Sequence, residues 1–213
     1  MEIVSLDHPL ITDLISQLRD TNTAPHRFRE AVRKLSTLLF YEAARDLKTE
    51  TTEIQTPLTK TQGIRVSEKI GLVPILRAGL GMADGILQLL PEAQVWHLGL
   101  YRDEKTLEAI SYYNKLSGAH PVEVAFVLDP MIATGGTAIR TVHTLEEWGV
   151  KRVKLIGLLA SKVGLEELEE KHPNTQVYVC AIDPELNEDG YIVPGLGDAG
   201  DRQFGTYWGK EAV

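Results

Sequence analysis

The residues best suited to chemistry lie within residues 122–150. An apolar run ends at Asp129, and the turn Thr134-Gly135-Gly136-Thr137 follows before a helical pattern begins. Glycines let the backbone approach a ligand closely, and the free N–H groups and the dipole of a helix that starts there favour an anion. The Asp129 carboxylate can accept hydrogen bonds from vicinal hydroxyls nearby. Together these features predict a site for a ribose 5-phosphate.

An ordinary strand-to-helix turn is the alternative, because glycine and threonine are common turn and cap residues. The turn has neither the Gly-Lys-Ser/Thr ending of a Walker loop nor the GxGxxG dinucleotide pattern. The position of Asp129 at the end of an apolar strand favours the ligand site over the plain turn.

Two arginines follow other apolar runs. Arg77 comes after residues 72–76 and precedes a glycine turn, and Arg102 comes after residues 94–101. Open α/β sheets bind ligands at the carboxyl ends of their strands, and a guanidinium can bind an anion with two hydrogen bonds. A solvated surface side chain is the alternative for Arg77. The long, charged connection after Arg102 suggests a lid, in which Tyr112 and Tyr113 either cover a ligand or pack.

The segment 190–209 is rich in glycine but also carries apolar and aromatic residues. That composition favours an ordered loop over a disordered tail, and it predicts neither helix nor strand. Bare backbone can recognise a flat heterocycle, since N–H groups donate to ring carbonyls and a C=O accepts from a ring N–H. Uracil fits this pattern. Cytosine would leave a polar group unpaired, at a cost of about 1–3 kcal/mol.

The rest of the chain predicts the elements that position these residues. Apolar runs alternate with helical patterns, which indicates an α/β fold with a parallel sheet. Two amphipathic helices fill the first fifty residues, and residues 51–70 predict a peripheral hairpin. The expected strands are 72–76, 94–101, 122–128, 153–159 and 177–182, and the expected helices are 82–90, 139–148 and 161–171.

Length and composition limit the possible functions. The 213 residues suit a single domain spanning 1–213, and a net charge of −8 argues against broad nucleic-acid binding. The single cysteine, Cys180, lies in an apolar run and predicts a buried thiol in a reducing cytoplasm. No apolar run approaches the roughly 20 residues of a membrane span, so no membrane partner is expected.

Four motifs resemble uracil phosphoribosyltransferases, in the family's order and over nearly the whole chain: VLDPMIATGGTA, PILRAGLGM, GLYRDEKTL and YIVPGLGDAGDRQFGT. Pro130 stands where most phosphoribosyltransferases carry a second acidic residue. The resemblance implies a parallel sheet flanked by helices, an N-terminal helical region, and a small base-binding hood partly from about 183–213. It implies transfer of a phosphoribosyl group from 5-phosphoribosyl 1-diphosphate (PRPP) to uracil, with Mg2+, in a homo-oligomer (dimer or tetramer) open to GTP control.

The resemblance also assigns roles to matching residues. Asp129 would hold the ribose hydroxyls, Arg77 and Arg102 the diphosphate, and Asp198 would face the diphosphate and its metal; these four are the expected catalytic residues. The other expected PRPP contacts are Ala78, Gly79, Pro130, Met131, Ile132, Ala133, Thr134, Gly135, Gly136 and Thr137. Uracil would contact Ile192, Gly197, Asp198 and Ala199. With Pro130 in place of a carboxylate, Mg2+ would bind mainly PRPP oxygens and water, with Asp198 as a further ligand.

Two other functions stay open. One is a transferase for a different base. The other is a regulatory pyrimidine or RNA sensor that keeps the fold, against which the acidic balance and the presence of Arg77 and Arg102 both weigh. No general base stands out, since His97 and His143 lie on a predicted strand and helix, where a structural role is expected. Residues 207–213 form an extension without a predicted role.

Overall fold

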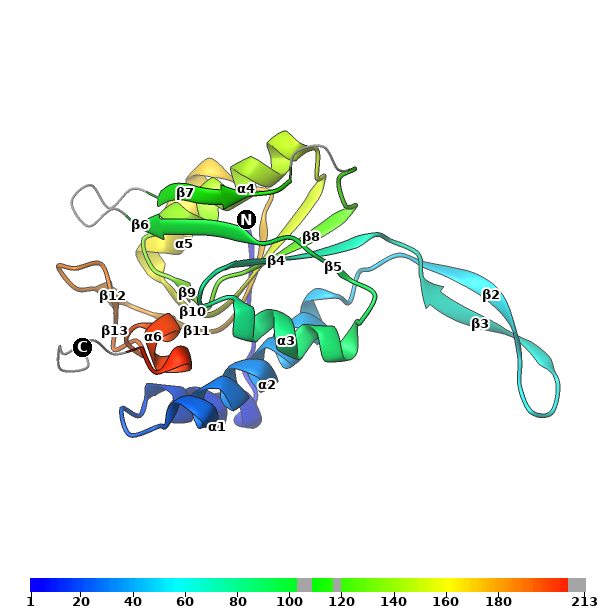
Figure 1. Cartoon of the computed structure of the whole chain (residues 1–213), viewed down its shortest axis with the longest axis horizontal. Coiled ribbons are helices and arrows are strands. Elements are labelled where there is room, and N and C mark those ends of the chain that lie inside the picture. Colours follow the sequence, from blue (N-terminus) through cyan, green and yellow to red (C-terminus); the bar gives the residue numbers. More distant parts are fainter. Residues whose placement is uncertain (103–108, 117–119, 207–213) are drawn as a thin grey trace.

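The computed structural model describes residues 1–102, 109–116 and 120–206. Within them, a nine-stranded sheet forms the centre of the molecule (Figure 1). Its main strands, in spatial order, are β1 (Glu2–Ser5), β11 (Gln176–Asp183), β10 (Arg152–Ser161), β8 (Val124–Leu128), β4 (Ile70–Leu76), β6 (Leu98–Arg102) and β7 (Ala109–Asn114). The short strands β5 (Gln94–Val95) and β9 (Met131–Ile132) pair with β4 and β10. All pairings in this sheet are parallel except β6 with β7.

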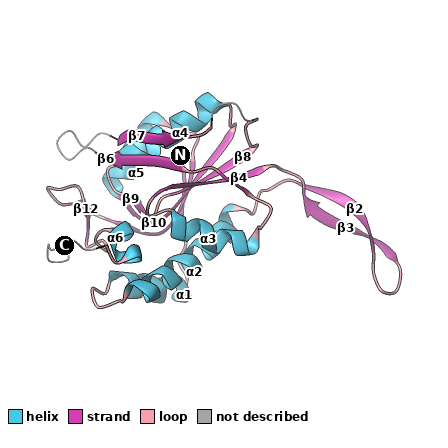
Figure 2. Cartoon of the chain, viewed as in Figure 1, coloured by secondary structure: helices cyan, strands magenta, loops and turns pink. Residues whose placement is uncertain are grey.

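Helices cover both faces of the sheet (Figure 2). They are α1 (Pro9–Arg19), α2 (Pro25–Ala43), α3 (Leu80–Leu89), α4 (Gly136–Trp148), α5 (Lys162–Lys171) and α6 (Ala199–Phe204). Phe126 and Leu128 of β8 pack with α1, α2 and α3, whereas Ala125 and Val127 pack with α4 and α5. Every residue of β8 is therefore buried, which is why its sequence is apolar throughout instead of alternating.

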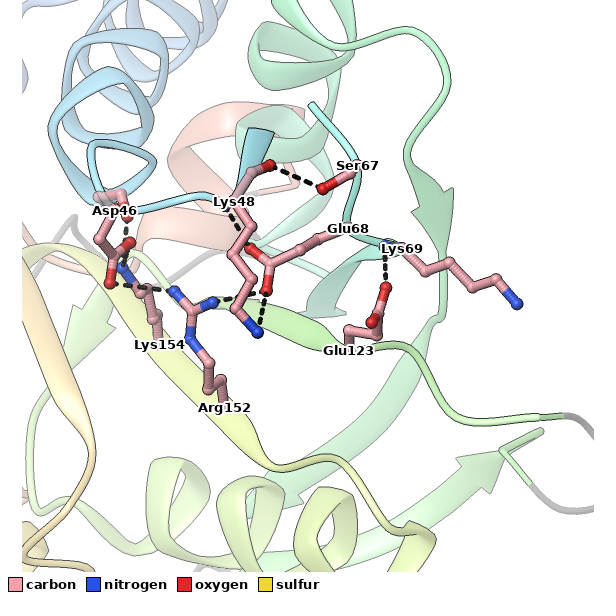
Figure 3. Close-up of polar contacts among 9 residues, drawn as sticks. Asp46, Lys48, Ser67, Glu68, Lys69, Glu123, Arg152 and Lys154 are labelled. Atoms are coloured by element: carbon pink, nitrogen blue, oxygen red, sulfur yellow. Dashed lines mark hydrogen bonds and ion pairs between the residues drawn. The ribbon is translucent and has the colours of Figure 1, made fainter. Parts of the chain in front are cut away.

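A two-stranded hairpin, β2 (Thr49–Gln55) and β3 (Lys60–Val66), extends from the body (Figure 1). Polar contacts hold its base against the amino-terminal edge of the sheet (Figure 3). Glu68 accepts from the Lys48 backbone N–H at 2.8 Å and pairs with Arg152 at 2.7 Å. Arg152 also pairs with Asp46 at 3.0 Å, and Asp46 pairs with the buried Lys154. The hairpin is thus fixed at its base, and its place at the periphery agrees with the prediction for residues 51–70.

The structure corrects four expectations. Strand β1 was not predicted, because four mostly exposed residues give no apolar pattern. The strand expected over 94–101 is interrupted at Trp96 and His97. Residues 109–114, expected to be irregular, form β7 beside β6. The segment expected to be too rich in glycine for a helix contains α6, because Asp198 caps its start and Gly205, with φ 65°, ends it.

None of the helices in the described ranges is long and apolar enough to cross a membrane.

Candidate active site

The central turn joins β8 to α4. The half-buried Asp129 follows the last residue of β8, and its Oδ1 accepts from the Met131 N–H at 3.3 Å. Gly135 is the N-cap of α4 and has φ 81°, a conformation that only glycine adopts readily. Because the cap is a glycine, it offers no side-chain acceptor to the first-turn N–H groups. The amino-terminal end of a 13-residue helix therefore faces the turn, as the sequence predicted for a phosphate site.

The start of α5 fixes the shape of this turn. Ser161 Oγ donates to the Ala133 carbonyl at 2.5 Å and accepts from the Gly164 N–H at 2.9 Å. A Cβ on Gly135 would lie 2.7 Å from the Gly164 carbonyl oxygen. The turn over residues 133–137 is thus held closely against the start of α5.

The Arg77 turn lies against the end of β8. It follows β4, the neighbour of β8 in the sheet, and a Cβ on Gly79 would lie 2.4 Å from the Leu128 carbonyl oxygen. The glycine therefore lets this turn approach the residue that directly precedes Asp129. Arg77 donates from Nη2 to Asp201 Oδ1 at 2.8 Å, and more than half of its side chain is exposed, so the guanidinium is ion-paired and still open to solvent.

The C-terminal loop begins with β12 (Glu185–Leu186) and β13 (Ile192–Val193), and it continues through a cis Val193–Pro194 bond to α6. Gly195 and Gly197 both have positive φ, 59° and 75°. Ile192 and Ala199 are buried residues, whereas Asp198 is exposed. The loop is ordered, as predicted from its apolar anchors.

An ion pair that the sequence did not predict holds this loop. Arg19 donates to both carboxylate oxygens of Asp183 at 2.7 Å and to the Gly195 carbonyl at 2.8 Å. Asp183 also accepts from the Gly195 N–H at 3.0 Å. Burial alone would raise the pKa of the Asp183 carboxyl, but the hydrogen bonds from Arg19 and Gly195 and the charge of Arg19 outweigh it, so the pKa lies below its ordinary value of 3.8.

Arg202 provides a second anchor. Its buried guanidinium donates to the Leu196 carbonyl at 2.7 Å and to the Asp20 carbonyl at 2.5 Å, and it lies 4.5 Å from the ring centroid of Phe28. These carbonyls belong to the loop and to the connection between α1 and α2. The Arg202 side chain is therefore structural, because it is buried and donates to backbone carbonyls of the protein.

The structure brings Asp129, the Arg77 turn and the C-terminal loop together at the carboxyl ends of the central strands. A Cβ on Gly200 would meet Asp198 Oδ1 at 3.2 Å and Arg77 Nη2 at 3.9 Å, so the C-terminal loop adjoins the Arg77 turn. Arg102 ends β6, next to β4, but its side chain lies outside the described residues, as do 103–108 and 207–213.

The other predicted roles have different outcomes. Cys180 is buried, and burial raises the pKa of its thiol to about 12, which makes it unreactive. His143 is exposed, with its Nε2 3.3 Å from Glu147 Oε1 on the same helix, and its structural role stays a prediction. Tyr112 and Tyr113 lie on β7 and are 56% and 38% exposed; whether they cover a ligand stays a prediction.

Comparison with known proteins identifies the family. The family model for uracil phosphoribosyltransferase matches residues 4–206. The uracil phosphoribosyltransferase of Roseiflexus sp. (strain RS-1) is 52% identical over 205 residues, which cover 96% of this chain and 99% of the relative. The solved structure of the AQ2163 protein from Aquifex aeolicus has a TM-score of 0.91 and 38% identity, covering 96% and 98% of the two chains.

A more distant structure shows the shared fold. The APRTase from Giardia lamblia complexed with 9-deazaadenine has a TM-score of 0.50 at 17% identity, covering 82% of this chain and 85% of that one. The likeness of fold and the family match agree with the sequence motifs. The chain belongs to the uracil phosphoribosyltransferase family.

Proposed function

We propose that the protein transfers the 5-phosphoribosyl group of PRPP to uracil, giving UMP and diphosphate in pyrimidine salvage. Membership of the family over nearly the whole chain supports this reaction. The structural observation that carries it is the meeting of two turns at the end of β8, where Gly79 lies against Leu128 next to Asp129. A phosphate, a ribose and a diphosphate can then be bound side by side.

PRPP would lie across these two turns. The N–H groups of residues 133–137 would bind the 5-phosphate at the start of α4, and Asp129 would accept hydrogen bonds from the ribose hydroxyls. Pro130, Met131 and Ile132 connect these two contacts along the sugar. Arg77, with the backbone of Ala78 and Gly79, would bind the diphosphate, and Arg102 would complete this group.

Uracil would be recognised by the backbone of the C-terminal loop. Ile192, Gly197 and Ala199 would supply carbonyl and N–H groups to the two ring carbonyls and the imide N–H. The support for this assignment is that Arg19 and Asp183 hold both backbone polar groups of Gly195 inside the loop. A rigid set of donors and acceptors discriminates against cytosine, because mismatched groups would be desolvated without a partner.

In the reaction, N1 of uracil bonds to C1 of the ribose as the bond from C1 to the diphosphate oxygen breaks. The diphosphate leaves with the electron pair, and the N1 proton is released to the diphosphate or to solvent. Positive charge develops on the ribosyl centre in the transition state, so the protein acts mainly by positioning and charge stabilisation. Arg77 and Arg102 would stabilise the charge on the leaving diphosphate. The carboxylate of Asp129 would hold the sugar in the orientation that the attack requires.

Mg2+ fits the oxygen donors of the site. Asp129 and Asp198 offer carboxylate oxygens, the type of ligand that Mg2+ prefers, and Asp198 lies beside the Arg77 turn. In the described part of the chain, no three acidic, histidine or cysteine side chains form a metal-binding group. We therefore propose that Mg2+ binds mainly PRPP oxygens and water, with Asp198 as a ligand. When bound, the ion neutralises part of the diphosphate charge.

Assembly and regulation are also proposals. A homo-oligomer, a dimer or tetramer, would have exposed apolar side chains available on the β2–β3 hairpin, where Ile54, Leu58 and Ile64 are 43%, 94% and 76% exposed. Light scattering of the purified protein tests this. Activation by GTP and a cytoplasmic location follow from the resemblance, and steady-state rates with and without GTP test the first.

A base-competition assay tests the reaction. Purified protein with Mg2+ and PRPP should release diphosphate with uracil and release little with cytosine, orotate or hypoxanthine. Efficient turnover of orotate would show that the C-terminal loop is misassigned. Preference for another base would indicate a different transferase, and binding of UMP without turnover would indicate a sensor.

A further inference from the structure

The position of the Arg77 guanidinium is determined by residues at the C-terminal end of the described chain. Arg77 Nη2 donates to Asp201 Oδ1 at 2.8 Å, and Nη1 donates to Thr206 Oγ1 at 3.4 Å. Thr206 Oγ1 in turn donates to the same Asp201 oxygen at 2.7 Å. A long arginine side chain that is 55% exposed would otherwise sample many rotamers. These contacts select one of them.

Asp201 is itself held by the capped helix α6. Its backbone N–H donates to Asp198 Oδ1 at 2.8 Å. Two residues later, the fully buried Gln203 donates from Nε2 to the Ala78 carbonyl at 2.9 Å. Helix α6 therefore contacts the Arg77 turn twice, once through the Asp201 carboxylate and once through Gln203.

The same helix is joined to the C-terminal loop. Gln203 Nε2 also donates to the Ala199 carbonyl at 3.1 Å, and Arg202 donates to the Leu196 carbonyl at 2.7 Å. The distance between the backbone assigned to uracil and the guanidinium assigned to diphosphate is consequently set through α6. A residue of α6 can influence PRPP binding without contacting the substrate.

We propose that Asp201 is a positioning residue that orients the Arg77 guanidinium toward the diphosphate of PRPP. This inference rests on the proposed function of Arg77. The guanidinium has five N–H groups, of which two are used in the contacts with Asp201 and Thr206. The remaining three can bind the diphosphate while the carboxylate fixes the plane of the group. Asp201 thus reduces the ordering cost of binding and does not itself touch the ligand.

A competing role for Asp201 makes the opposite prediction. If the carboxylate occupied Arg77 in place of the diphosphate, its removal would tighten PRPP binding. The geometry favours positioning, because Asp201 uses a single oxygen and a single nitrogen of Arg77 instead of the bidentate contact that would block an edge of the guanidinium. The Asp201 side chain is 32% exposed, so solvent weakens its ion pair and the pair contributes little to the free energy of unfolding. We therefore expect the loss of Asp201 to affect PRPP binding.

Steady-state kinetics of the full-length chain test the proposal. Asp201→Ala should raise KM for PRPP about tenfold, the size expected for one oriented charged contact, while KM for uracil stays within about twofold. Asp201→Asn should have a smaller effect, because an amide oxygen can still accept from Arg77. The control is Asp84→Ala, which removes an exposed carboxylate on α3 and should leave KM for PRPP and KM for uracil unchanged. Thermal unfolding should give the same Tm for all three variants within about 3 °C.

A double-mutant cycle with Arg77→Ala isolates the contact. In the Arg77→Ala background, Asp201→Ala should change KM for PRPP by less than about twofold, because the group that it orients is gone. The proposal is overturned if Asp201→Ala lowers KM for PRPP, raises both KM values alike, or has its full effect without Arg77. If Arg77→Ala alone leaves KM for PRPP unchanged, the diphosphate assignment fails and the positioning role fails with it. If Arg77→Ala raises KM for PRPP but Asp201→Ala does not, the diphosphate assignment of Arg77 stands and only the positioning role of Asp201 is refuted.

Discussion

Asp183 and Arg19 form a bidentate ion pair that also holds both backbone polar groups of Gly195. The two guanidinium hydrogen bonds to the carboxylate are 2.7 Å each, and the Asp183 side chain is 7% exposed. One partner ends helix α1 and the other ends strand β11, 164 residues away. The pair therefore joins the N-terminal helical region to the loop proposed to read the base.

Replacing Asp183 by Asn should loosen that loop. In the variant, Arg19 loses the buried negative charge that balances its own, so we expect a loss of about 3 kcal/mol in the free energy of unfolding. We also expect a rise in KM for uracil. KM for PRPP should change much less. Urea denaturation and steady-state kinetics measure the two effects.

A matched control is Glu42→Gln, which weakens the ion pair between the last turn of α2 and Arg45, whose side chain is 72% exposed. It should change the free energy of unfolding by less than about 1 kcal/mol and leave KM for uracil unaltered. Equal effects of the two substitutions would contradict the role given to Asp183.

Stability should fall at acid pH because three paired carboxyl groups have lowered pKa values. Burial acts to raise the pKa of Asp46, Glu68 and Asp183, but their hydrogen bonds and cationic partners lower it overall. A group whose pKa is lower in the folded state binds its proton more weakly there than in the unfolded chain. Its contribution is complete above the ordinary values of 3.8 and 4.5 and is lost as pH falls through the folded pKa.

Thermal unfolding measured from pH 7 to pH 3 checks this prediction. The wild type should lose Tm mainly below about pH 4.5, and Asp183→Asn, already destabilised at neutral pH, should lose less over the same interval. A Tm of the wild type that rises on acidification would have the wrong sign for these pairs.

Asp129→Asn should reduce turnover far more than stability. An amide can no longer offer two charged acceptors to the ribose hydroxyls, and removing one preorganised polar contact in an active site typically costs about 10²-fold in kcat. The free energy of unfolding should change by less than about 1 kcal/mol, since the amide oxygen can still accept from the Met131 N–H. Near-normal kinetics would remove the proposed ribose contact.

Gly135→Ala should impair both stability and PRPP binding. The residue has φ 81°, and its Cβ would lie 2.7 Å from the Gly164 carbonyl oxygen, so the turn must move. We expect a loss of about 1–3 kcal/mol in the free energy of unfolding and a raised KM for PRPP. Chemical denaturation and kinetics measure both.

The neighbouring glycine supplies the comparison for stability. A Cβ on Gly136 would meet its nearest neighbour, Thr134 Oγ1, at 3.8 Å, and the position lies in the first turn of α4. Gly136→Ala should therefore keep the free energy of unfolding within about 1 kcal/mol of the wild type. If both variants unfold alike, the strain argued for Gly135 is wrong.

The sequence allowed the central elements to be predicted because local patterns determine them. Strand β8 is apolar at every position because both of its faces are covered. The turn before α4 contains glycine because residue 135 has a positive φ, 81°. The positions of Asp129 and Arg77 at strand ends follow from the parallel sheet, and the structure brings their turns together.

The remaining features depend on contacts between distant parts of the chain. The edge strand β1 is mostly exposed, and only its pairing with β11 defines it. Helix α6 depends on a cap at Asp198 that outweighs the glycines around it. The partners of Asp183 and Asp201 lie more than 100 residues away, so no local spacing could reveal these ion pairs.

The most direct test of the site is a crystal structure of the protein with UMP bound. We expect the 5-phosphate against the N–H groups of residues 133–137, the ribose hydroxyls at Asp129, and the uracil ring hydrogen-bonded to the backbone of residues 192–199. A nucleobase placed away from that loop, or a phosphate outside the 133–137 turn, would contradict it.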